Sequence, residues 1–280
     1  MPPLDRDTAR AWIARWDRQQ EVYLPDREDR FTVLIDAVEA AAGRPDPVVL
    51  DLGCGPGSLA GRLLDRLPAA TVIAVDADPL LLALGRAAER GRGGLRFVDC
   101  DLRVPGWSAA LSLDRPADAA VSTTALHWLT EAELRVMYTE VAGALRRGGV
   151  LLNGDHFVAD APALARLERG LMEAQKRRSL AGHAGGRGRP CGHSVDGTAA
   201  TAGHGGAHEN WSQWWAAVAA DPRLAEFNAE REHRWAAAAH HGTESGRLAA
   251  HVGALEAAGF CQIGTLWQRA ENRLLCGFRR

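Results

Sequence analysis

The sequence predicts an α/β fold with a doubly wound, mostly parallel sheet of seven strands. Short apolar runs alternate with helical stretches, which is typical of a parallel sheet that is covered on both faces. Right-handed crossovers make such a sheet doubly wound. The expected strands are 48–52, 71–75, 95–98, 118–122 and 149–153, and the expected helices between them are 58–67, 79–90 and 131–146.

The last strands depart from this parallel pattern. A helix is expected over 248–258 and ends at Gly259, and strands follow at roughly 261–267 and 273–278. The polar turn at 269–272 that joins these two strands is far too short for a crossover connection. We therefore expect the last two strands to be antiparallel.

The chain divides into three parts. They are N-terminal helices at 1–44, a sheet domain at 45–159 and 246–280, and a helical lid at 160–245 that is inserted after the fifth strand. Pro25 and Asp26 separate two helical patterns in the first part. In the lid, helical pieces are expected near 161–180 and 209–240. The segment between them, 181–208, is rich in Gly, Ala and His and cannot bury enough apolar surface to order firmly. We expect a flexible loop there.

Composition argues against several classes of protein. The chain has 280 residues and a formal net charge of −2, which gives no global attraction to nucleic acid. No apolar run reaches the roughly 20 residues of a membrane span, and the first residues do not resemble a signal peptide. The five cysteines have long spacings without a CxxC pair, which favours free thiols in the cytoplasm. No His and Cys spacing matches a zinc site, so no metal is expected.

A glycine loop follows the first expected strand. Gly53, Gly55 and Gly57 have the spacing G-x-G-x-G, whereas a dinucleotide-binding loop has G-x-G-x-x-G. Asp51 precedes the first glycine by two residues. Its carboxylate would repel a pyrophosphate but would attract a cationic ligand group. The loop therefore predicts a nucleoside-like ligand with a positive charge.

Acidic or small polar residues follow three further strands. Asp76 ends the second strand, where a carboxylate can accept hydrogen bonds from ribose hydroxyls. Asp101 follows the third strand, where an acid can accept a bond from an adenine amino group. Thr123 and Thr124 end the fourth strand. Taken alone, Asp76 could instead be a helix cap and Asp101 a solvated loop acid.

These motifs together resemble those of class I, seven-stranded S-adenosylmethionine (SAM)-dependent methyltransferases of the small-molecule type. The resemblance rests on 49–57 (VLDLGCGPG), 75–78 (VDAD), 99–102 (DCDL), 125–129 (ALHWL) and 145–149 (LRRGG). In the last motif Arg147 replaces the usual proline of a structural turn. Asp101 matches the adenine-binding acid better than Asp99 does.

The resemblance implies SAM as cofactor and S-adenosylhomocysteine (SAH) as product. It also implies that the seventh strand is inserted antiparallel between the fifth and sixth, and that the N-terminal helices close over SAM. Tyr23 is then a candidate for contact with the methionine end. The expected cofactor-binding residues are Tyr23, Asp51, Gly53, Cys54, Gly55, Asp76, Ala77, Asp101, Leu102, Thr123 and Thr124.

Two histidines are candidates for a catalytic base. His127 follows the fourth strand and His156 ends the fifth, so both are expected at the edge where methyl transfer would occur. A packed histidine that positions Trp128 is the alternative for His127. The expected substrate-binding residues are His127, Trp128, Asp155, Trp211, Trp215 and His241. Trp211, Trp214 and Trp215 share one helical face, which could instead anchor the lid.

The leading hypothesis is a methyltransferase that modifies an oxygen, nitrogen or carbon atom of a small molecule, in the setting of secondary metabolism. An RNA or protein methyltransferase and a non-catalytic SAM-binding module are the alternatives. The expected partner is a small-molecule acceptor, with neither a membrane nor nucleic acid involved. We expect a monomer or a homodimer.

Overall fold

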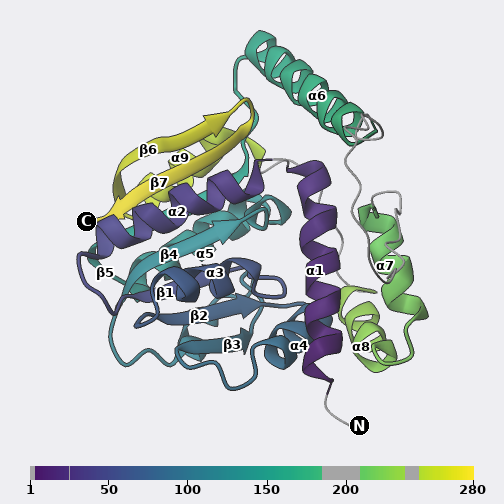
Figure 1. Ribbon diagram of the computed structural model, residues 1–280. Helices are drawn as coiled ribbons and strands as arrows, with labels where there is room; N and C mark the ends of the chain where they lie inside the picture. Colours follow the sequence, from purple (N-terminus) through teal and green to yellow (C-terminus); the bar gives the residue numbers. More distant parts are fainter. Residues whose placement is uncertain (1–3, 25, 185–208, 237–245) are drawn as a thin grey trace, which may run out of the picture.

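A seven-stranded sheet lies at the centre of the molecule (Figure 1). The computed structural model describes residues 4–24, 26–184, 209–236 and 246–280. The strands are β1 (Val48–Leu52), β2 (Thr71–Asp76), β3 (Leu95–Asp99), β4 (Ala117–Thr123), β5 (Leu145–His156), β6 (Phe260–Arg269) and β7 (Asn272–Arg279). Their order is β3-β2-β1-β4-β5-β7-β6. The first five strands are parallel, and β7 pairs antiparallel with both β5 and β6. This confirms the predicted fold class and the position of the last strand.

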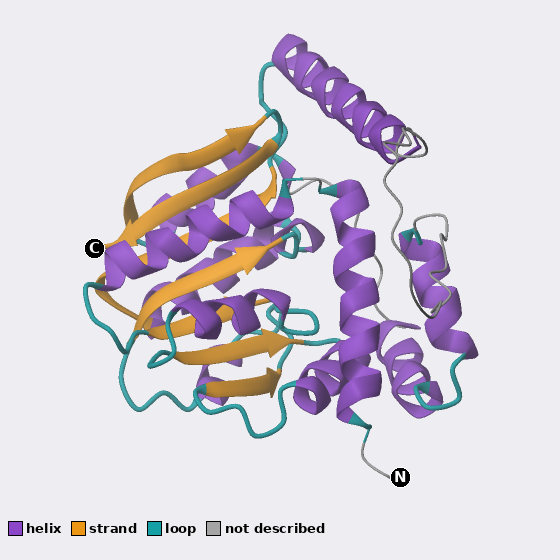
Figure 2. Cartoon of the chain, viewed as in Figure 1, coloured by secondary structure: helices purple, strands orange, loops and turns teal. Residues whose placement is uncertain are grey.

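Helices surround the sheet (Figure 2). They are α1 (Arg6–Tyr23), α2 (Arg27–Ala42), α3 (Ser58–Arg66), α4 (Pro79–Ala88), α5 (Glu131–Ala144), α6 (Pro162–Ala184), α7 (Trp211–Ala220), α8 (Ala225–Ala236) and α9 (Leu248–Ala257), with 3₁₀ turns η1 (Trp107–Leu111) and η2 (Leu126–Trp128). Several start at caps that the sequence encodes. The Asp78 carboxylate accepts the N–H groups of Leu80 and Leu81 at the start of α4. Thr130 and Glu133 form a capping box at the start of α5.

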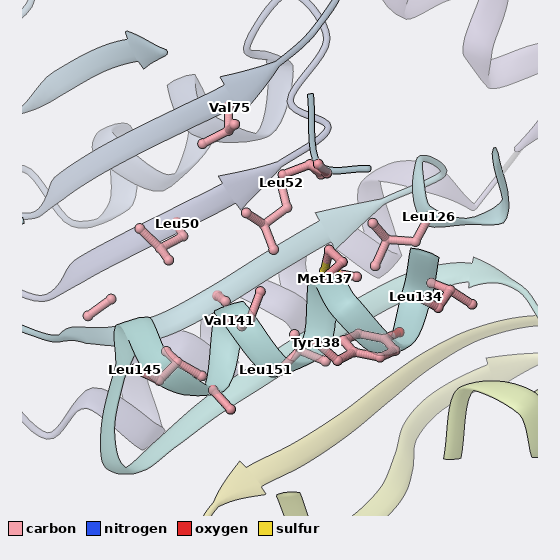
Figure 3. Packing of buried hydrophobic residues seen from close by; sticks show 14 of the residues in the cluster. Leu50, Leu52, Val75, Leu126, Leu134, Met137, Tyr138, Val141, Leu145 and Leu151 are labelled. Atoms are coloured by element: carbon pink, nitrogen blue, oxygen red, sulfur yellow. The ribbon is translucent and has the colours of Figure 1, made fainter. Parts of the chain in front are cut away.

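Side chains of alternate residues along the strands pack on opposite faces of the sheet. Leu50 and Leu52 of β1 pack with α5 and α9, together with Met137 and Tyr138 (Figure 3). Val49 packs on the other face with residues of α2 and α3. Strands buried on both faces need continuous apolar sequence, which explains why the runs of apolar residues located them correctly.

Several predicted boundaries differ from the observed ones by a few residues, and three differences are larger. Strand β5 starts at Leu145, so the end of the helix expected to reach 146 belongs to the strand. Helix α6 continues to Ala184, four residues into the segment expected to be a loop. The helical stretch expected near 209–240 is interrupted between α7 and α8, because Pro222 cannot continue a helix. The rest of the predicted flexible loop, 185–208, lies outside the described residues.

The described helices of the segment after β5 contact two different parts of the molecule. Helix α6 reaches the β6–β7 end of the sheet, where Glu168 and Arg273 form a buried ion pair at 2.7 Å. Helix α7 packs on α1, and Trp214 meets Trp12 edge to face with centroids 5.7 Å apart. Helix α8 packs on α4. Helices α7 and α8 thus lie beside α1, where α1 crosses the ends of the parallel strands (Figure 1).

Candidate functional site

A cavity of about 790 Å³ lies at the carboxyl ends of strands β1 to β5. This is the edge at which open α/β sheets bind ligands. Residues of α1, α2, α7 and α8 form its other walls. We call the wall at the ends of β1, β2 and β3 the acidic half, which contains Asp51, Asp76, Asp78 and Asp101. We call the wall at the ends of β4 and β5 the histidine half, which contains Thr123, Thr124, His127 and His156.

The glycine loop connects β1 to α3 along the acidic half. Gly53 has a φ of 67°, and a Cβ atom at this position would lie 2.4 Å from the Cβ of Ala125. Only glycine fits such a left-handed position next to another chain segment. The N–H groups of Gly53 and Cys54 both donate to the carbonyl of Val75, and that of Gly55 donates to Asp76 at 2.7 Å. These bonds join the loop to the end of β2.

Asp51 presents an unsatisfied carboxylate to the cavity. The residue is only 1% exposed, and its Oδ2 has no hydrogen-bond partner within the described part of the chain. Burial, with a smaller contribution from the charge of Asp76, raises the pKa of Asp51 to about 7. A buried acceptor without a partner is costly in a folded protein. A cationic ligand group in the cavity would supply the missing partner.

Asp76 and Asp101 continue the acidic half and differ in their partners. Burial raises the pKa of Asp76 to about 6, although its carboxylate accepts the N–H groups of Asp78 and Gly55. Asp101 forms an ion pair with Arg103 at 2.7 Å. Burial alone would raise the pKa of Asp101, but the hydrogen bonds from Arg103 outweigh this effect and lower that pKa. Asp99 pairs with Arg234 and does not line the cavity, so the geometry favours Asp101 as the adenine candidate.

The histidine half contains a hydrogen-bonded pair. His127 lies in η2 directly after β4, and its Nδ1 is 2.9 Å from Oδ1 of Asp155. Asp155 is 1% exposed and does not line the cavity. The expectation that Asp155 touches the substrate is therefore not supported, because its carboxylate is buried behind His127. Burial lowers the pKa of His127, but the charge and hydrogen bond of Asp155 outweigh it and raise that pKa overall.

His156 also lines the cavity, with different electrostatics. Burial lowers its pKa despite the nearby Asp155 charge. Its Nδ1 is buried and has no hydrogen-bond partner among the residues described. His156 is thus a neutral neighbour of the more basic His127.

A buried arginine that the sequence analysis missed lies behind this half. Arg30 of α2 is fully buried, and its guanidinium donates to Asn272 of β7 at 2.6 Å and to the Thr124 hydroxyl at 3.4 Å. Burial lowers the pKa of Arg30 to about 10, and the charge of Asp155 opposes this. The one available signal was the position of Arg30 beside Phe31 on the buried face of α2, in a region where a charged residue is unusual.

Aromatic side chains close the remaining side of the cavity. Trp211 and Trp215 line it with Trp16 of α1, whose ring centroid is 5.3 Å from that of Trp211. The Arg231 guanidinium lies 3.6 Å from the centroid of the Trp215 ring, and its Nε is 2.7 Å from Asp78. Trp214 is fully buried and anchors α7, which was the alternative considered for this cluster.

All eleven expected cofactor-binding residues line this cavity, and so do His127, His156, Trp128, Trp211 and Trp215. Their roles remain predictions. His241 lies outside the described residues. Sequence reasoning missed several further lining residues, which come from α2, α8 and the turn after β3 and meet at the cavity only in the folded chain. These are Arg27, Arg103, Arg231 and Trp235.

Two further findings, on membrane spans and on metal sites, concern only the residues that the structure describes. None of their helices has the length and apolar character needed to cross a membrane. They also contain no cluster of three or more His, Cys, Asp or Glu side chains placed to hold a metal ion.

The sheet order, the glycine loop and the strand-end acids define a class I Rossmann-like methyltransferase fold. Residues 49–149 match the methyltransferase domain family. Over this region the chain is similar to class I SAM-dependent methyltransferases. The curated relatives include trans-aconitate 2-methyltransferases from Azoarcus sp. (31% identical over 136 residues, 49% of each chain) and from Mycobacterium tuberculosis (37% over 119 residues, 41% of this chain and 40% of the relative). The chain spans about half the length of the curated relatives it matches.

Solved structures share the fold at low sequence identity. The magnesium protoporphyrin IX methyltransferase of Synechocystis has a TM-score of 0.51 and 17% identity, over 96% of this chain and 94% of that one. An O-methyltransferase family protein from Burkholderia thailandensis has a TM-score of 0.53 and 18% identity, over 94% of this chain and 58% of that one. This likeness extends the shared fold beyond the region of sequence similarity.

Proposed function

We propose that this chain transfers a methyl group from SAM to a small molecule, with SAM in the acidic half of the cavity and the acceptor in the histidine half. The buried Oδ2 of Asp51, which has no hydrogen-bond partner among the described residues, carries the proposal. It is buried, lines the cavity and sits beside a loop where even a Cβ atom would not fit. The SAM amino group is a cation that would satisfy it.

The other acids fit the rest of the cofactor. We expect Asp76, at the end of β2, to accept bonds from the ribose hydroxyls of SAM, and Asp101 to accept one from its adenine amino group. When bound, SAM supplies a methyl group on a cationic sulfur that leaves as a neutral thioether. The protein's contribution is to align the acceptor with that methyl group and to exclude water. Trp16, Trp211 and Trp215 form a wall suited to excluding water.

The cavity volume of about 790 Å³ supports a small acceptor beside SAM. The relatives named trans-aconitate 2-methyltransferase make trans-aconitate the first acceptor to test. Methylation at oxygen, nitrogen or carbon of a secondary metabolite belongs to the same proposal. We also propose that the protein acts in the cytoplasm, as a monomer or a homodimer.

Calorimetry with SAM and SAH tests the proposal. We expect the wild-type chain to bind both, and Asp76→Ala to weaken binding by about 1–3 kcal/mol, the cost of lost bonds to a charged acceptor. Asp65→Ala removes an exposed carboxylate from α3 and should leave affinity unchanged. An absence of binding heat with either ligand contradicts the proposal. Mass spectrometry of trans-aconitate incubated with SAM then tests methyl transfer itself.

A further inference from the structure

A second, smaller pocket lies where the start of α1 packs beside the end of α4 (Figure 1). Its volume is about 390 Å³. We call it the arginine pocket, because four of its seven lining residues are arginines. The lining residues are Arg6 and Arg10 of α1, Ala88 at the end of α4, and Glu89, Arg90, Gly91 and Arg92 after it. The arginine pocket and the 790 Å³ cavity at the strand ends have no lining residue in common, so they are separate sites.

Two hydrogen bonds connect the walls of the arginine pocket. The Arg6 guanidinium donates to the carbonyl of Arg90, and the Arg90 guanidinium donates to the carbonyl of Leu4 at 3.1 Å. Each arginine thus reaches across to the segment that carries the other. A guanidinium has five N–H donors and each of these bonds uses one, so most of the donors remain for a ligand. Both side chains are therefore oriented before a ligand binds.

The positive charge of the arginine pocket is only partly balanced. Arg92 pairs with Glu89 at 3.1 Å and with Asp65 at 2.6 Å. Among the described residues, no carboxylate forms an ion pair with the other three arginines. Asp5 and Asp7 are close in sequence to α1's first turn but do not line the pocket. Three like charges around one pocket repel one another, and an anion between them would turn this repulsion into attraction.

The first turn of α1 favours an anion as well. Helix α1 begins at Arg6, and the Asp5 carboxylate caps it by accepting the N–H of Thr8 at 2.9 Å. The start of a helix carries a partial positive charge that stabilises anions nearby. Arg10 lies one turn further along the same side of α1. Its side chain forms no hydrogen bond or ion pair with any residue that the structure describes, so all its donors can serve a ligand.

We propose that the arginine pocket binds a small free anion with a diphosphate group, and that the bound anion holds α1 against α4. Guanidinium groups bind phosphate oxygens through paired N–H donors. One phosphate group carries a charge of about −1.5 to −2 at pH 7, so a second group brings the total closer to that of three arginines. The volume of about 390 Å³ leaves room for both groups. This site goes beyond the proposed methyl transfer and does not depend on it.

The two helices that meet at the arginine pocket also reach the cavity at the strand ends. Helix α1 contributes Trp16 and Gln20 to the wall of that cavity, and α4 starts at its cap Asp78, which lines the cavity too. An anion that joins the start of α1 to the end of α4 should therefore stabilise this wall. The joint effect is measurable as the thermal stability of the folded chain.

Calorimetry with pyrophosphate tests the site at about 150 mM NaCl, where attraction between distant charges is screened. We expect the wild type to bind pyrophosphate whether or not SAH is present. Arg10→Gln should weaken this binding by about 10-fold or more, because it removes charge-assisted hydrogen bonds, and Arg10→Lys should weaken it less. Arg135→Gln removes an exposed arginine of α5 that lies outside the pocket, and should leave the affinity unchanged. An absence of binding, equal affinity in Arg10→Gln and wild type, or displacement of pyrophosphate by SAH overturns the inference.

Thermal melting tests whether the anion stabilises the fold. Pyrophosphate should raise the Tm of the wild type and of Arg135→Gln by a few degrees, since a ligand that binds only the folded state stabilises it. The rise should be smaller in Arg10→Gln, whose Tm without pyrophosphate should not fall below that of the wild type. An equal rise in Arg10→Gln contradicts the inference.

Flotation with phosphatidylglycerol vesicles separates a free anion from a lipid headgroup, because both carry phosphate. We expect the wild type to remain unbound to the vesicles, since the arginine pocket is sized for a small molecule. Flotation of the wild type that is abolished in Arg10→Gln would overturn the assignment to a small free anion. The result does not bear on SAM binding, which the calorimetry with SAM and SAH decides by itself.

Discussion

The two halves of the cavity are built in different ways. The acidic half takes its key groups from three consecutive strand ends within residues 51–101, and each lies in a short local motif. The histidine half combines His127 after β4 and Asp155 in β5 with Arg30 of α2 and Asn272 of β7. Local motifs are readable in a sequence, whereas contacts between distant segments are not. The cofactor is therefore much easier to predict than the acceptor.

The largest expected effect concerns Arg30, which is buried behind the histidine half. Arg30→Met should lower the free energy of unfolding by about 3 kcal/mol, because it leaves Asn272 and Asp155 without a buried cationic partner. Arg44→Met removes an exposed arginine that pairs with Asp46, and should cost less than about 1 kcal/mol. Urea unfolding of both variants measures the difference. Equal costs would mean that Arg30 contributes no more than a surface charge.

In the acidic half, Asp51→Asn should weaken SAH binding by roughly 10- to 100-fold, since a neutral amide replaces the carboxylate that would face the amino group. The fold should survive, because Oδ2 of Asp51 has no partner to lose among the described residues. Calorimetry at pH 7.5 measures the affinity, and thermal melting checks the fold. Unchanged affinity would place the amino group elsewhere in the cavity.

The Asp51 carboxyl should also make the stability of the ligand-free protein depend on pH. Its pKa is about 7 in the folded chain against a usual 3.8, so the folded state binds the proton more tightly. That contribution to stability is present below pH 3.8 and is lost as the pH rises through 7. Asp51→Asn should therefore raise the Tm relative to wild type by a few degrees at pH 8 and by less at pH 5. A difference in Tm that shrinks with rising pH would contradict this sign.

The smallest expected effect is at Asp101, because its carboxylate already has a partner in Arg103. Asp101→Asn keeps an oxygen that can accept a bond from adenine, so SAH affinity should fall by less than about 1 kcal/mol. Calorimetry beside Asp51→Asn gives the comparison. A larger loss at Asp101 than at Asp51 would reverse the ranking of the strand-end acids.

Much of the fold was predictable because buried parallel strands need continuous apolar residues. The prediction for β1, 48–52, matches the structure residue for residue, and the antiparallel last strands followed from the short turn before Asn272. The boundary at β5 was missed because Arg146, Arg147 and Gly148 do not look like a strand, although they extend one. The local sequence pattern cannot show that the pairing of β5 with its neighbouring strands begins before its run of apolar residues.

The lining of the cavity was predictable where one residue and its strand end were enough. Asp155 was expected to touch substrate because it ends β5, yet its carboxylate turns inward to His127. Which way a strand-end side chain turns depends on its neighbours in space. Arg30 was missed for a similar reason, since its partners come from β4 and β7. Both cases concern the histidine half, where tertiary contacts decide the chemistry.

The position of β7 has a consequence for how the protein is made. This strand lies inside the sheet, between β5 and β6, although it is the last strand in the sequence. While the chain is being synthesised, β5 therefore has an unpaired edge until β7 emerges and inserts. The Asn272 that receives the Arg30 guanidinium arrives with β7. A nascent chain would carry the acids of the acidic half early, whereas Arg30 behind the histidine half would gain its Asn272 partner only near the end of synthesis.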